Sequence, residues 1–423
     1  MLFVFGVDPA RKGFHQLSVM IAETREVIIR QKVKGNQALI TEIKDQILQL
    51  NDTYTHVKVI LGIEHQENVL RLAAQELDLP IYSINAAKLS YHNKAVNLGE
   101  DKSDVIDADA VCHYLAAHFQ KLTTYQPRSD LDEEAYCLSR QLDCVRKQKT
   151  QVWQRFWCVA DSVVPDLKDV LEARAKNLWF LNMIEELFSK NGFKHTGIKA
   201  FTSYCSKKQA QGKPEFFGRL LDLLKEAHCT KNVRCLLPLH ARMLLALLSE
   251  EKLLVKSAEE TVLQWEYGVL LSSIPCMKAK TIVRLQAHFG SKLATVEPPK
   301  LCAYSGLAPV LKQSGTPRRK DLRKMSPAQR KRYEPFRIQR KACNHDLQSA
   351  MLLFTFVSLL NHPWAKNAYD RYKHRGQTHY EALRNVGMKW MKIIHAMARD
   401  HKPYDMYSHQ QNIQKHQDPL NAR

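Results

Sequence analysis

The N-terminal part of the chain alternates between short apolar runs and amphipathic stretches, a pattern typical of a mixed α/β domain. Three apolar runs rich in β-branched residues, LFVFGVD, QLSVMIA and EVIIRQKV, are joined by short polar turns and predict an antiparallel meander. Helical and extended patterns then alternate along the chain. We expect helices over 36–50, 67–77, 88–96 and 104–119, and strands over 56–64 and 80–85.

Three meander strands followed by alternating helices and strands is the order of the RNase H and RuvC-like resolvase fold. Within this order, four carboxylates fall at strand ends and at a helix start. Asp8 closes the word GVD, Glu64 closes the word GIE, and Asp104 and Asp107 stand three apart, so they share one helix face. Each acid alone is more typical of a helix cap or an exposed position. Converging hard oxygen ligands, however, are what Mg²⁺ takes beside phosphate oxygens. Their joint occurrence favours a metal-dependent phosphodiester enzyme.

Three further acids lie close to these four and are weaker candidates. Glu67 is the alternative to Glu64. Asp101 has a suitable spacing but precedes the expected helix cap Ser103, and Asp109 turns away from the shared helix face.

The middle of the chain has a helical pattern. Residues 135–161 form one long amphipathic stretch whose aromatic stripe, WQRFW, favours a protein core over stacking on RNA bases. Residues 191–231 lack long apolar runs and predict a surface-exposed elaboration, and helical periodicity returns over 236–265. We therefore expect an α/β RuvC-like domain over 1–155, a helical coiled-coil connector with an insertion over 156–265, and a mainly α domain over 266–423.

The charge of the chain points to a nucleic-acid partner. It carries 63 Lys and Arg against 43 Asp and Glu, a net charge of +20, and such an excess favours polyanions. Residues 311–345 hold half of this excess, with 12 basic and 2 acidic side chains. Because so one-sided a run repels itself unless a polyanion is present, it favours contact with RNA or DNA over a solvated loop. The candidate contacts in this stretch are Lys312, Arg318, Arg319, Lys320 and Arg323.

Other classes of chemistry find less support in the sequence. The ten cysteines lack metal-ligand spacing, and the histidines form no HExxH motif. The run MLFVFGVDPA is broken by Asp8 too early for a signal peptide. The most apolar C-terminal run, 350–360, falls short of the ~20 residues that a membrane helix needs, so we expect no membrane partner.

One long segment, YSINAAKLSYHNKAVNLGEDKSDVIDADAVCHYL, resembles the signature of the DEDD-type insertion-sequence transposases. Four later segments resemble the C-terminal half of that family, in the same order: LSSIPCMKAKTIVRLQAHFG, LCAYSGLAPVLKQSGTPRR, RKACNHDLQSAMLLF and AYDRYKHRGQTHYEALRNVGMKWMKIIHAM. With the N-terminal acids these segments span roughly two thirds of the chain, which makes the resemblance far more specific than one motif.

The resemblance implies an RNA-guided DNA recombinase. It implies that the four acids bind one or two Mg²⁺ and that a noncoding bridge RNA specifies target and donor DNA. It places the serine nucleophile, which becomes linked to the DNA strand end, at Ser314 in KQSGTPRR, with Ser305 as the nearby decoy. It also implies a coiled-coil spacer over 236–265 that pairs protomers, a homodimer or homotetramer with a composite active site, and a bacterial or archaeal cytoplasm.

The chain departs from the family pattern in two places. The word GIEHQENV stands where a Glu-x-Thr-Gly word is usual, so Glu64 fits by its place and not by its neighbours. The usual IPGxG turn reads IPCMKAKT, where Lys278 and Lys280 are expected to contact phosphate by charge.

Two functions remain open from the residues. In the first, a transposase, the acids and Ser314 cut and rejoin DNA. The alternative is a junction-resolvase-like metal-dependent endonuclease that uses water as the nucleophile, since the Ser-Gly pair at 314–315 would otherwise favour an ordinary turn in a basic loop. A non-catalytic nucleic-acid-binding remnant is less favoured because the four acids are intact.

Overall fold

A computed structural model describes the chain except for residues 11–12, 87, 91, 93–102, 172–177, 188–196, 208–209, 211–212, 226–235, 313–335 and 418–423. The chain divides into two compact units, Met1–Arg128 and Ser129–Arg423. The expected boundary between residues 155 and 156 falls within a continuous helix of the second unit.

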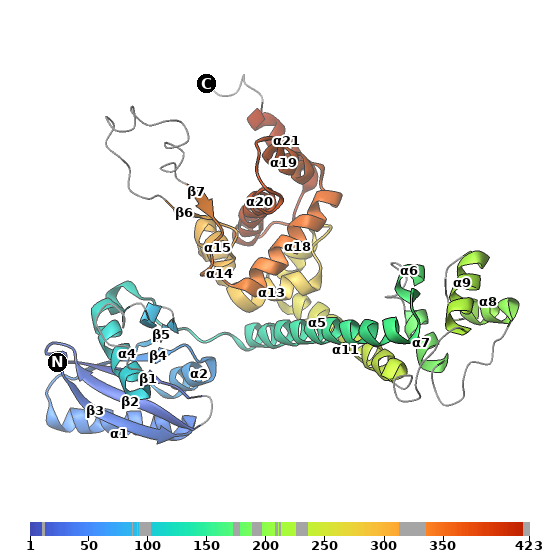
Figure 1. Cartoon of the computed structure of the whole chain (residues 1–423). Coiled ribbons are helices and arrows are strands. Elements are labelled where there is room, and N and C mark those ends of the chain that lie inside the picture. Colours follow the sequence, from blue (N-terminus) through green and yellow to red (C-terminus); the bar gives the residue numbers. More distant parts are fainter. Residues whose placement is uncertain are drawn as a thin grey trace, which may run out of the picture. The chain divides into compact units, whose positions relative to one another are not determined.

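The first unit is built on a five-stranded sheet with the strand order β3-β2-β1-β4-β5 (Figure 1). Strands β1, β2 and β3 pair antiparallel, as the meander predicts, whereas β4 lies parallel to both β1 and β5. The α/β domain expected from the sequence is therefore present. Its elements are β1 (Leu2–Asp8), β2 (Phe14–Ile21), β3 (Val27–Lys34), α1 (Asn36–Thr53), β4 (Lys58–Glu64), α2 (Glu67–Glu76), β5 (Ile81–Ile84), α4 (Asp104–His118) and the 3-10 turn η1 (Phe119–Lys121).

The two faces of this sheet are covered by different helices. Alternate residues of β1, such as Phe3 and Phe5, pack with α1 and α2 in one apolar cluster. The intervening Val4 packs with residues of α4, including Val111, in a second cluster. Because successive side chains of a strand point to opposite faces, both faces of the central strand are buried. The charged ends of β1 and β4 lie beyond these buried stretches, where the strands stop.

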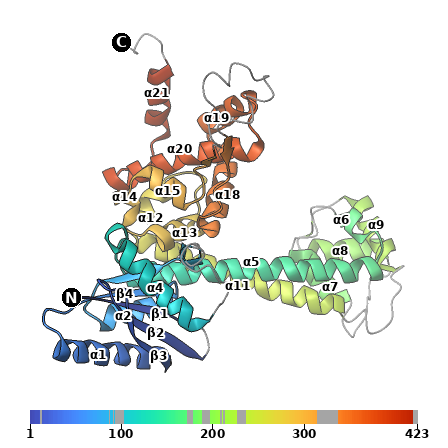
Figure 2. The same ribbon diagram turned by 60° about the vertical axis from the view of Figure 1, so that its left-hand side comes forward.

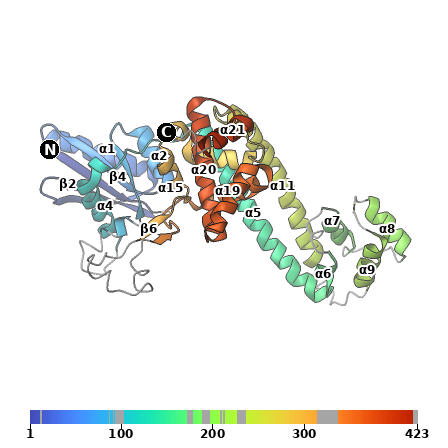
Figure 3. The same ribbon diagram turned by 90° about the horizontal axis from the view of Figure 1, so that it is seen from above.

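The second unit begins with a long helical hairpin. Helices α5 (Asp130–Val163) and α11 (Leu236–Gln264) lie side by side (Figure 3). They confirm the helical stretches that the periodicity predicts over 135–161 and 236–265. In the aromatic stripe of α5, Phe156 is fully buried, while Trp153 and Trp157 pack against the same cluster. The structure therefore confirms that this stripe belongs to a protein core.

The short helices that the structure describes between the hairpin arms correct one expectation. The sequence predicts a surface-exposed elaboration over 191–231, but Phe201 and Leu220 in this range are fully buried in a cluster shared with both hairpin arms. The apolar residues are spaced for short amphipathic helices and interleaved with lysines, which hides them from a search for long apolar runs. These helices are α6 (Leu167–Leu171), α7 (Leu178–Leu187), α8 (Ile198–Lys207) and α9 (Pro214–Lys225).

The remainder of the second unit is mainly helical, as expected (Figure 2). Its core surrounds the fully buried Trp390, whose indole N–H donates to the Ser358 hydroxyl at 2.8 Å. The same core includes the first turns of α5 and the end of α11, which ties the hairpin to this part of the unit. The elements are α12 (Gly268–Ser272), α13 (Ala279–Phe289), α14 (Lys292–Thr295), α15 (Pro298–Tyr304), β6 (Val310–Lys312), β7 (Phe336–Ile338), α18 (His345–Asn361), α19 (Pro363–His374), α20 (His379–Asp400) and α21 (Met406–Gln417).

No helix in the described part of the chain combines the length and the apolar character that crossing a bilayer would require.

Candidate active site

Asp8 and Glu64 stand at the ends of two neighbouring parallel strands. Strands β1 and β4 run in register up to the pair of Val7 and Ile63, and each strand ends at the acid that follows. The carboxyl ends of neighbouring parallel strands reach the same edge of a sheet. Both acids are partly exposed.

Two glycines fix which face of the sheet these acids share. Gly6 and Gly62 are paired in the register of β1 and β4, and each lies two residues before its acid. A Cβ atom at Gly6 would stand 2.5 Å from the Ala108 carbonyl oxygen of α4, so α4 crosses this strand at the glycine. Because side chains alternate along a strand, residues 6 and 8 face the same side, as do residues 62 and 64. The two acids therefore project on the side covered by α4.

The direction of α4 brings its first turn to the same edge. The Cys112 thiol donates to the Val4 carbonyl oxygen at 3.4 Å, while Ala108, one turn earlier, lies at Gly6. Moving back along α4 therefore means moving forward along β1, toward Asp8. The first turn of α4, which holds Asp104 and Asp107, is therefore directed toward the edge at which β1 and β4 end.

The start of α4 is set locally by Ser103. Its backbone is extended, its hydroxyl accepts a hydrogen bond from the Ile106 amide at 3.3 Å, and its carbonyl oxygen accepts from the Asp107 amide at 3.0 Å. This is the N-cap that the sequence predicts. Acids in the first turn are favoured by the helix dipole, which also helps to hold two carboxylates close together there.

The four acids fit a hard cation in their chemistry. Carboxylate oxygens are the donors that Mg²⁺ prefers, and no Cys or His is needed for such a site. Among the residues that the structure describes, however, no three His, Cys, Asp or Glu side chains converge closely enough to hold one metal ion. The fold thus directs the elements that carry the acids toward one edge without arranging the acids as a finished coordination site.

Asp109, one of the weaker candidate acids, contacts residues of two strands. The Asp109 carboxylate accepts a hydrogen bond from the Ser18 hydroxyl at 2.6 Å and pairs with Arg30 at 2.9 Å, which ties α4 to β2 and β3. Asp109 is thus directed toward β2 and β3. Asp101 lies outside the described residues.

Glu67, the alternative to Glu64, is also engaged. Its carboxylate accepts hydrogen bonds from the Tyr125 hydroxyl at 2.7 Å and from Arg128 at 2.9 Å. These contacts tie the first turn of α2 to the last residues of the first unit. Glu67 thus lies in the first turn of α2, whereas Glu64 ends β4 beside the end of β1.

One residue at this edge was missed by the sequence analysis. Gln16 of β2 is opposite Asp8 in the register, and it shares its face with Ser18, which contacts α4 through Asp109. The Gln16 side chain is buried, and its Oε1 atom finds no hydrogen-bond donor in the described part of the chain. A buried amide oxygen without a hydrogen-bond donor is costly, which makes Gln16 a further candidate beside Asp8. Its signal in the sequence was a pair of polar residues, Gln16 and Ser18, inside an otherwise apolar strand.

Gly6, whose lack of a side chain lets α4 pack against β1, allows a test of this arrangement. Gly6→Ala is expected to lower the stability of the first unit by roughly 1–3 kcal/mol, because the new methyl group would meet the rigid backbone of α4. Gly62→Ala is expected to cost less, since its Cβ would meet the Val111 and Leu115 side chains at 2.9 and 3.1 Å, and side-chain ends can move. Calorimetric melting of the two variants checks this order, and equal stabilities would contradict it.

The predicted serine and most of its basic neighbours, namely Ser314, Arg318, Arg319, Lys320 and Arg323, lie outside the described residues. The structure does describe where this segment leaves and rejoins the fold. Strands β6 and β7 pair antiparallel, with Lys312 opposite Phe336. A two-stranded ribbon therefore brackets the segment that holds Ser314.

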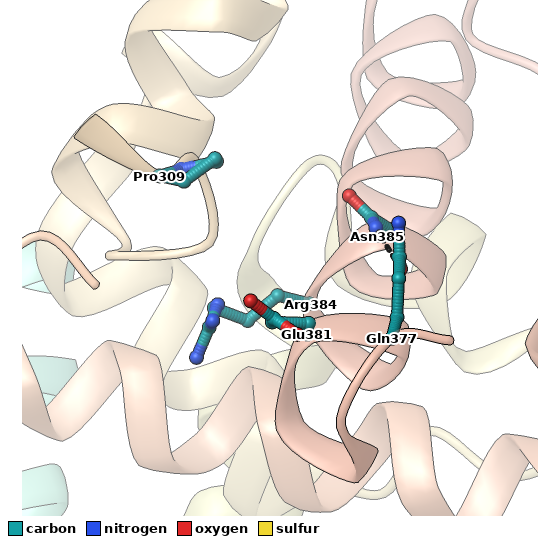
Figure 4. A pocket seen from close by; sticks show the side chains of 5 residues that line it. All are labelled: Pro309, Gln377, Glu381, Arg384 and Asn385. Atoms are coloured by element: carbon teal, nitrogen blue, oxygen red, sulfur yellow. Dashed lines mark hydrogen bonds between the residues drawn. The ribbon is translucent and has the colours of Figure 1, made fainter. Parts of the chain in front are cut away.

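A small pocket of about 60 Å³ lies beside this ribbon (Figure 4). Pro309, which precedes β6, lies on one side of it, and polar residues of α20 and of the preceding turn lie on the other. The Gln377 side-chain oxygen accepts from the Asn385 amide at 2.7 Å. The Glu381 carboxylate caps α20, and hydrogen bonds from the backbone and side chain of Thr378 hold its pKa below the ordinary value. Pro309, just before the segment that holds Ser314, thus lies beside polar side chains of α20 and of the turn before it.

The two lysines of IPCMKAKT have different surroundings. Ile274–Lys278 forms a tight turn between α12 and α13, in which the Ile274 carbonyl oxygen accepts from the Met277 amide at 3.0 Å. Lys278 is exposed where α13 begins, whereas Lys280 pairs with Glu251 of α11 at 2.6 Å. Lys278 is therefore the better placed of the two to contact a phosphate.

Comparison with known proteins agrees with the resemblance seen in the sequence. The sequence model of the IS110-type DEDD family, described as a transposase, matches residues 5–165. The insertion element IS110 uncharacterized 43.6 kDa protein of Streptomyces coelicolor is 22% identical over 311 residues, which cover 73% of this chain and 73% of that protein. The resemblance to the DEDD-type insertion-sequence transposases is thus confirmed.

Proposed function

We propose, from the premise that residues 5–165 are a DEDD-type transposase domain, that this protein is a DNA transposase that cuts and rejoins DNA strands under the guidance of a noncoding bridge RNA. The proposal is supported by the elements that carry the four acids: Asp8 and Glu64 end neighbouring parallel strands, and Asp104 and Asp107 lie in the first turn of α4, which covers that face of the sheet. Transposition of DNA is the general activity of the matched family, and the finer steps below are our proposal.

In this proposal Asp8, Glu64, Asp104 and Asp107 would hold one or two Mg²⁺. The bound cation would neutralise the phosphate oxygens at the scissile bond. The chain itself contributes the positions of the acids, because the strand ends and the capped helix start are set by the fold and not by the ligand. Gln16 would add a neutral oxygen at the same edge.

Ser314 is the proposed nucleophile. The Ser314 hydroxyl gives up its proton as its Oγ–P bond forms. The bond between phosphorus and one deoxyribose oxygen breaks, and that oxygen takes up one proton and leaves as a sugar hydroxyl, so the proton count is unchanged. The reverse exchange joins the strand to a new sugar hydroxyl, so the phosphoester bond is conserved and no ATP is needed. A serine hydroxyl is a weak nucleophile until nearby charges lower the cost of its alkoxide, and the basic residues of this segment supply such charges.

The proposed partners are target DNA, donor DNA, the guide RNA and further copies of the chain. The net charge of +20 and the basic stretch 311–345 support binding to nucleic acid. The acids and Ser314 lie in different units of the chain, and we propose that a homodimer or homotetramer, paired through the α5–α11 hairpin, combines them in a composite active site.

The experiment that tests the proposal is a recombination assay in bacterial cells with donor and target plasmids and the noncoding DNA that flanks the gene. Asp104→Asn and Ser314→Ala are each expected to lower recombination by about a thousandfold or more, because each removes a group that acts on the reacting phosphate. A covalent protein–DNA adduct, detected on denaturing gels, is expected with the wild type and not with Ser314→Ala.

The alternative function has a different outcome in the same assay. If cleavage survives in Ser314→Ala but is lost in Asp104→Asn, the protein is a metal-dependent endonuclease that uses water as its nucleophile. If both variants recombine as the wild type does, neither function holds.

A further inference from the structure

A second pocket, of about 140 Å³, lies between α19 and α20 of the second unit. It is lined by Arg371, Tyr372 and Arg375 from the end of α19 and by Lys389 from the middle of α20, with Ala368 at its base. Its volume is several times the roughly 30 Å³ that one water molecule occupies in the liquid. Three cationic side chains therefore share one small pocket.

This arrangement costs free energy in the protein alone. Burial lowers the pKa of the Lys389 ammonium, and the charges of Arg371, Lys392 and Arg375 lower it further. Like charges held close together repel one another, and the half-buried Lys389 also loses hydration. The Tyr372 ring, 5.7 Å from the Lys389 nitrogen at its centroid, offsets part of this cost.

No acid compensates the three cations. Within the described residues, none of the three side chains forms an ion pair or donates a hydrogen bond to the protein. Other cations of the same two helices do have acidic partners, as in Lys366 with Asp370 at 2.9 Å and Arg399 with Asp400 at 2.7 Å. Among the residues described, the pocket is thus lined by three cations and by no acidic side chain.

The helix dipole explains only part of the cluster. Arg371 and Arg375 lie at the C-terminal end of α19, where cations are favoured by the carbonyl groups. Lys389 stands in the middle of α20, where the dipole gives no such benefit, and it is half-buried in the pocket. An anion bound between the two helices would offset the repulsion among Lys389, Arg371 and Arg375.

We infer that this pocket binds a phosphate group of a nucleic-acid backbone, held by the forks of Arg371 and Arg375 and by the ammonium of Lys389. Arginine forks match the oxygens of a phosphate, and lysine adds a point charge. The choice of a phosphodiester over another anion rests on the proposed function, which gives the protein DNA and RNA as partners. The site lies outside the predicted contacts at 278–280 and 311–345, so it adds a separate anchoring point.

The test compares two double variants of the full-length chain. Arg371→Gln/Arg375→Gln removes two charges from the pocket, and Lys300→Gln/Lys366→Gln removes two from exposed lysines that already pair with acids. Binding to a fluorescent 30-base-pair DNA duplex and to a single-stranded RNA of equal length is measured against salt concentration. The pocket variant is expected to bind at least one probe about tenfold more weakly or worse, with a salt slope smaller by roughly 1–2. The control is expected to change affinity less than about threefold.

A second measurement on the wild type does not depend on any variant folding. Lysine acetylation is followed by mass spectrometry with and without each probe, and we expect bound nucleic acid to protect Lys389 at least fivefold while Lys366 stays reactive. Protection by DNA alone or by RNA alone identifies the source of the phosphate. Unprotected Lys389 in a bound complex, or equal losses in both double variants, overturns the inference and leaves the proposed function intact. A wild type that binds neither probe overturns both.

Discussion

Glu64→Gln is expected to lower the rate of DNA strand cleavage by about a thousandfold or more, which corresponds to about 4 kcal/mol of lost transition-state stabilisation. The substitution keeps the size and hydrogen-bonding shape of the side chain but removes its negative charge. Because Glu64 stands beside Asp8 at the ends of two parallel strands, its charge is one of four that would hold the cation at the reacting phosphate. Cleavage is measured with purified protein, guide RNA and excess divalent cation.

The matched control is Glu67→Gln, which removes the same charge three residues away. Glu67 accepts hydrogen bonds from Tyr125 and Arg128, so its loss is expected to lower stability by roughly 1–2 kcal/mol and to change the cleavage rate less than about tenfold. If Glu67→Gln abolishes cleavage and Glu64→Gln does not, Glu67 is the metal ligand and our assignment is wrong.

The largest stability effect is expected at Asp143 of α5. Its buried carboxylate pairs with Arg284 of α13, whose side chain is 13% exposed. Asp143→Ala leaves this guanidinium buried without its acid, and breaking such a pair from one side costs about 3–5 kcal/mol. The midpoint of thermal unfolding of the second unit is expected to fall by on the order of 5–10 °C, as measured by calorimetry.

Arg146→Ala is the control for this prediction. Arg146 also contacts the Asp143 carboxylate, at 3.4 Å, but its side chain is 60% exposed. Removing an exposed partner of a salt bridge costs at most about 1 kcal/mol, because water replaces it. Equal losses of stability in the two variants would contradict the view that the buried pair between α5 and α13 holds these helices together.

The elements of the first unit could be predicted closely from the sequence. The runs that end at Asp8 and Glu64 are strands, and the helix start at Ser103 has the expected cap. These features depend on side-chain periodicity and on local hydrogen bonds, both of which are determined by residues that are close in sequence. The long helices α5 and α11 could be predicted equally well, because an amphipathic pattern sustained over many turns fits no regular secondary structure other than a helix.

The parts that sequence reasoning missed depend on residues far apart in the chain. Phe201 and Leu220 were assigned to an exposed elaboration, yet they are buried because α8 and α9 pack with residues of both hairpin arms. Gln16 was overlooked as a candidate site residue because only the pairing of β1 with β2 places it opposite Asp8. The pocket cations escaped notice since Lys389 meets Arg371 and Arg375 only when α20 packs against α19.

The sequence by itself determined the identities of the four acids, the element on which each lies, the cap of α4, the basic character of 311–345 and the resemblance to a transposase family. Only the tertiary structure decided that Asp8 and Glu64 share a face with the first turn of α4, because that depends on α4 crossing β1 and β4 at Gly6 and Gly62. It likewise decided which of the neighbouring acids are engaged elsewhere. A sequence pattern encodes local geometry, whereas the convergence of charges is set by long-range packing, which no short stretch of sequence contains.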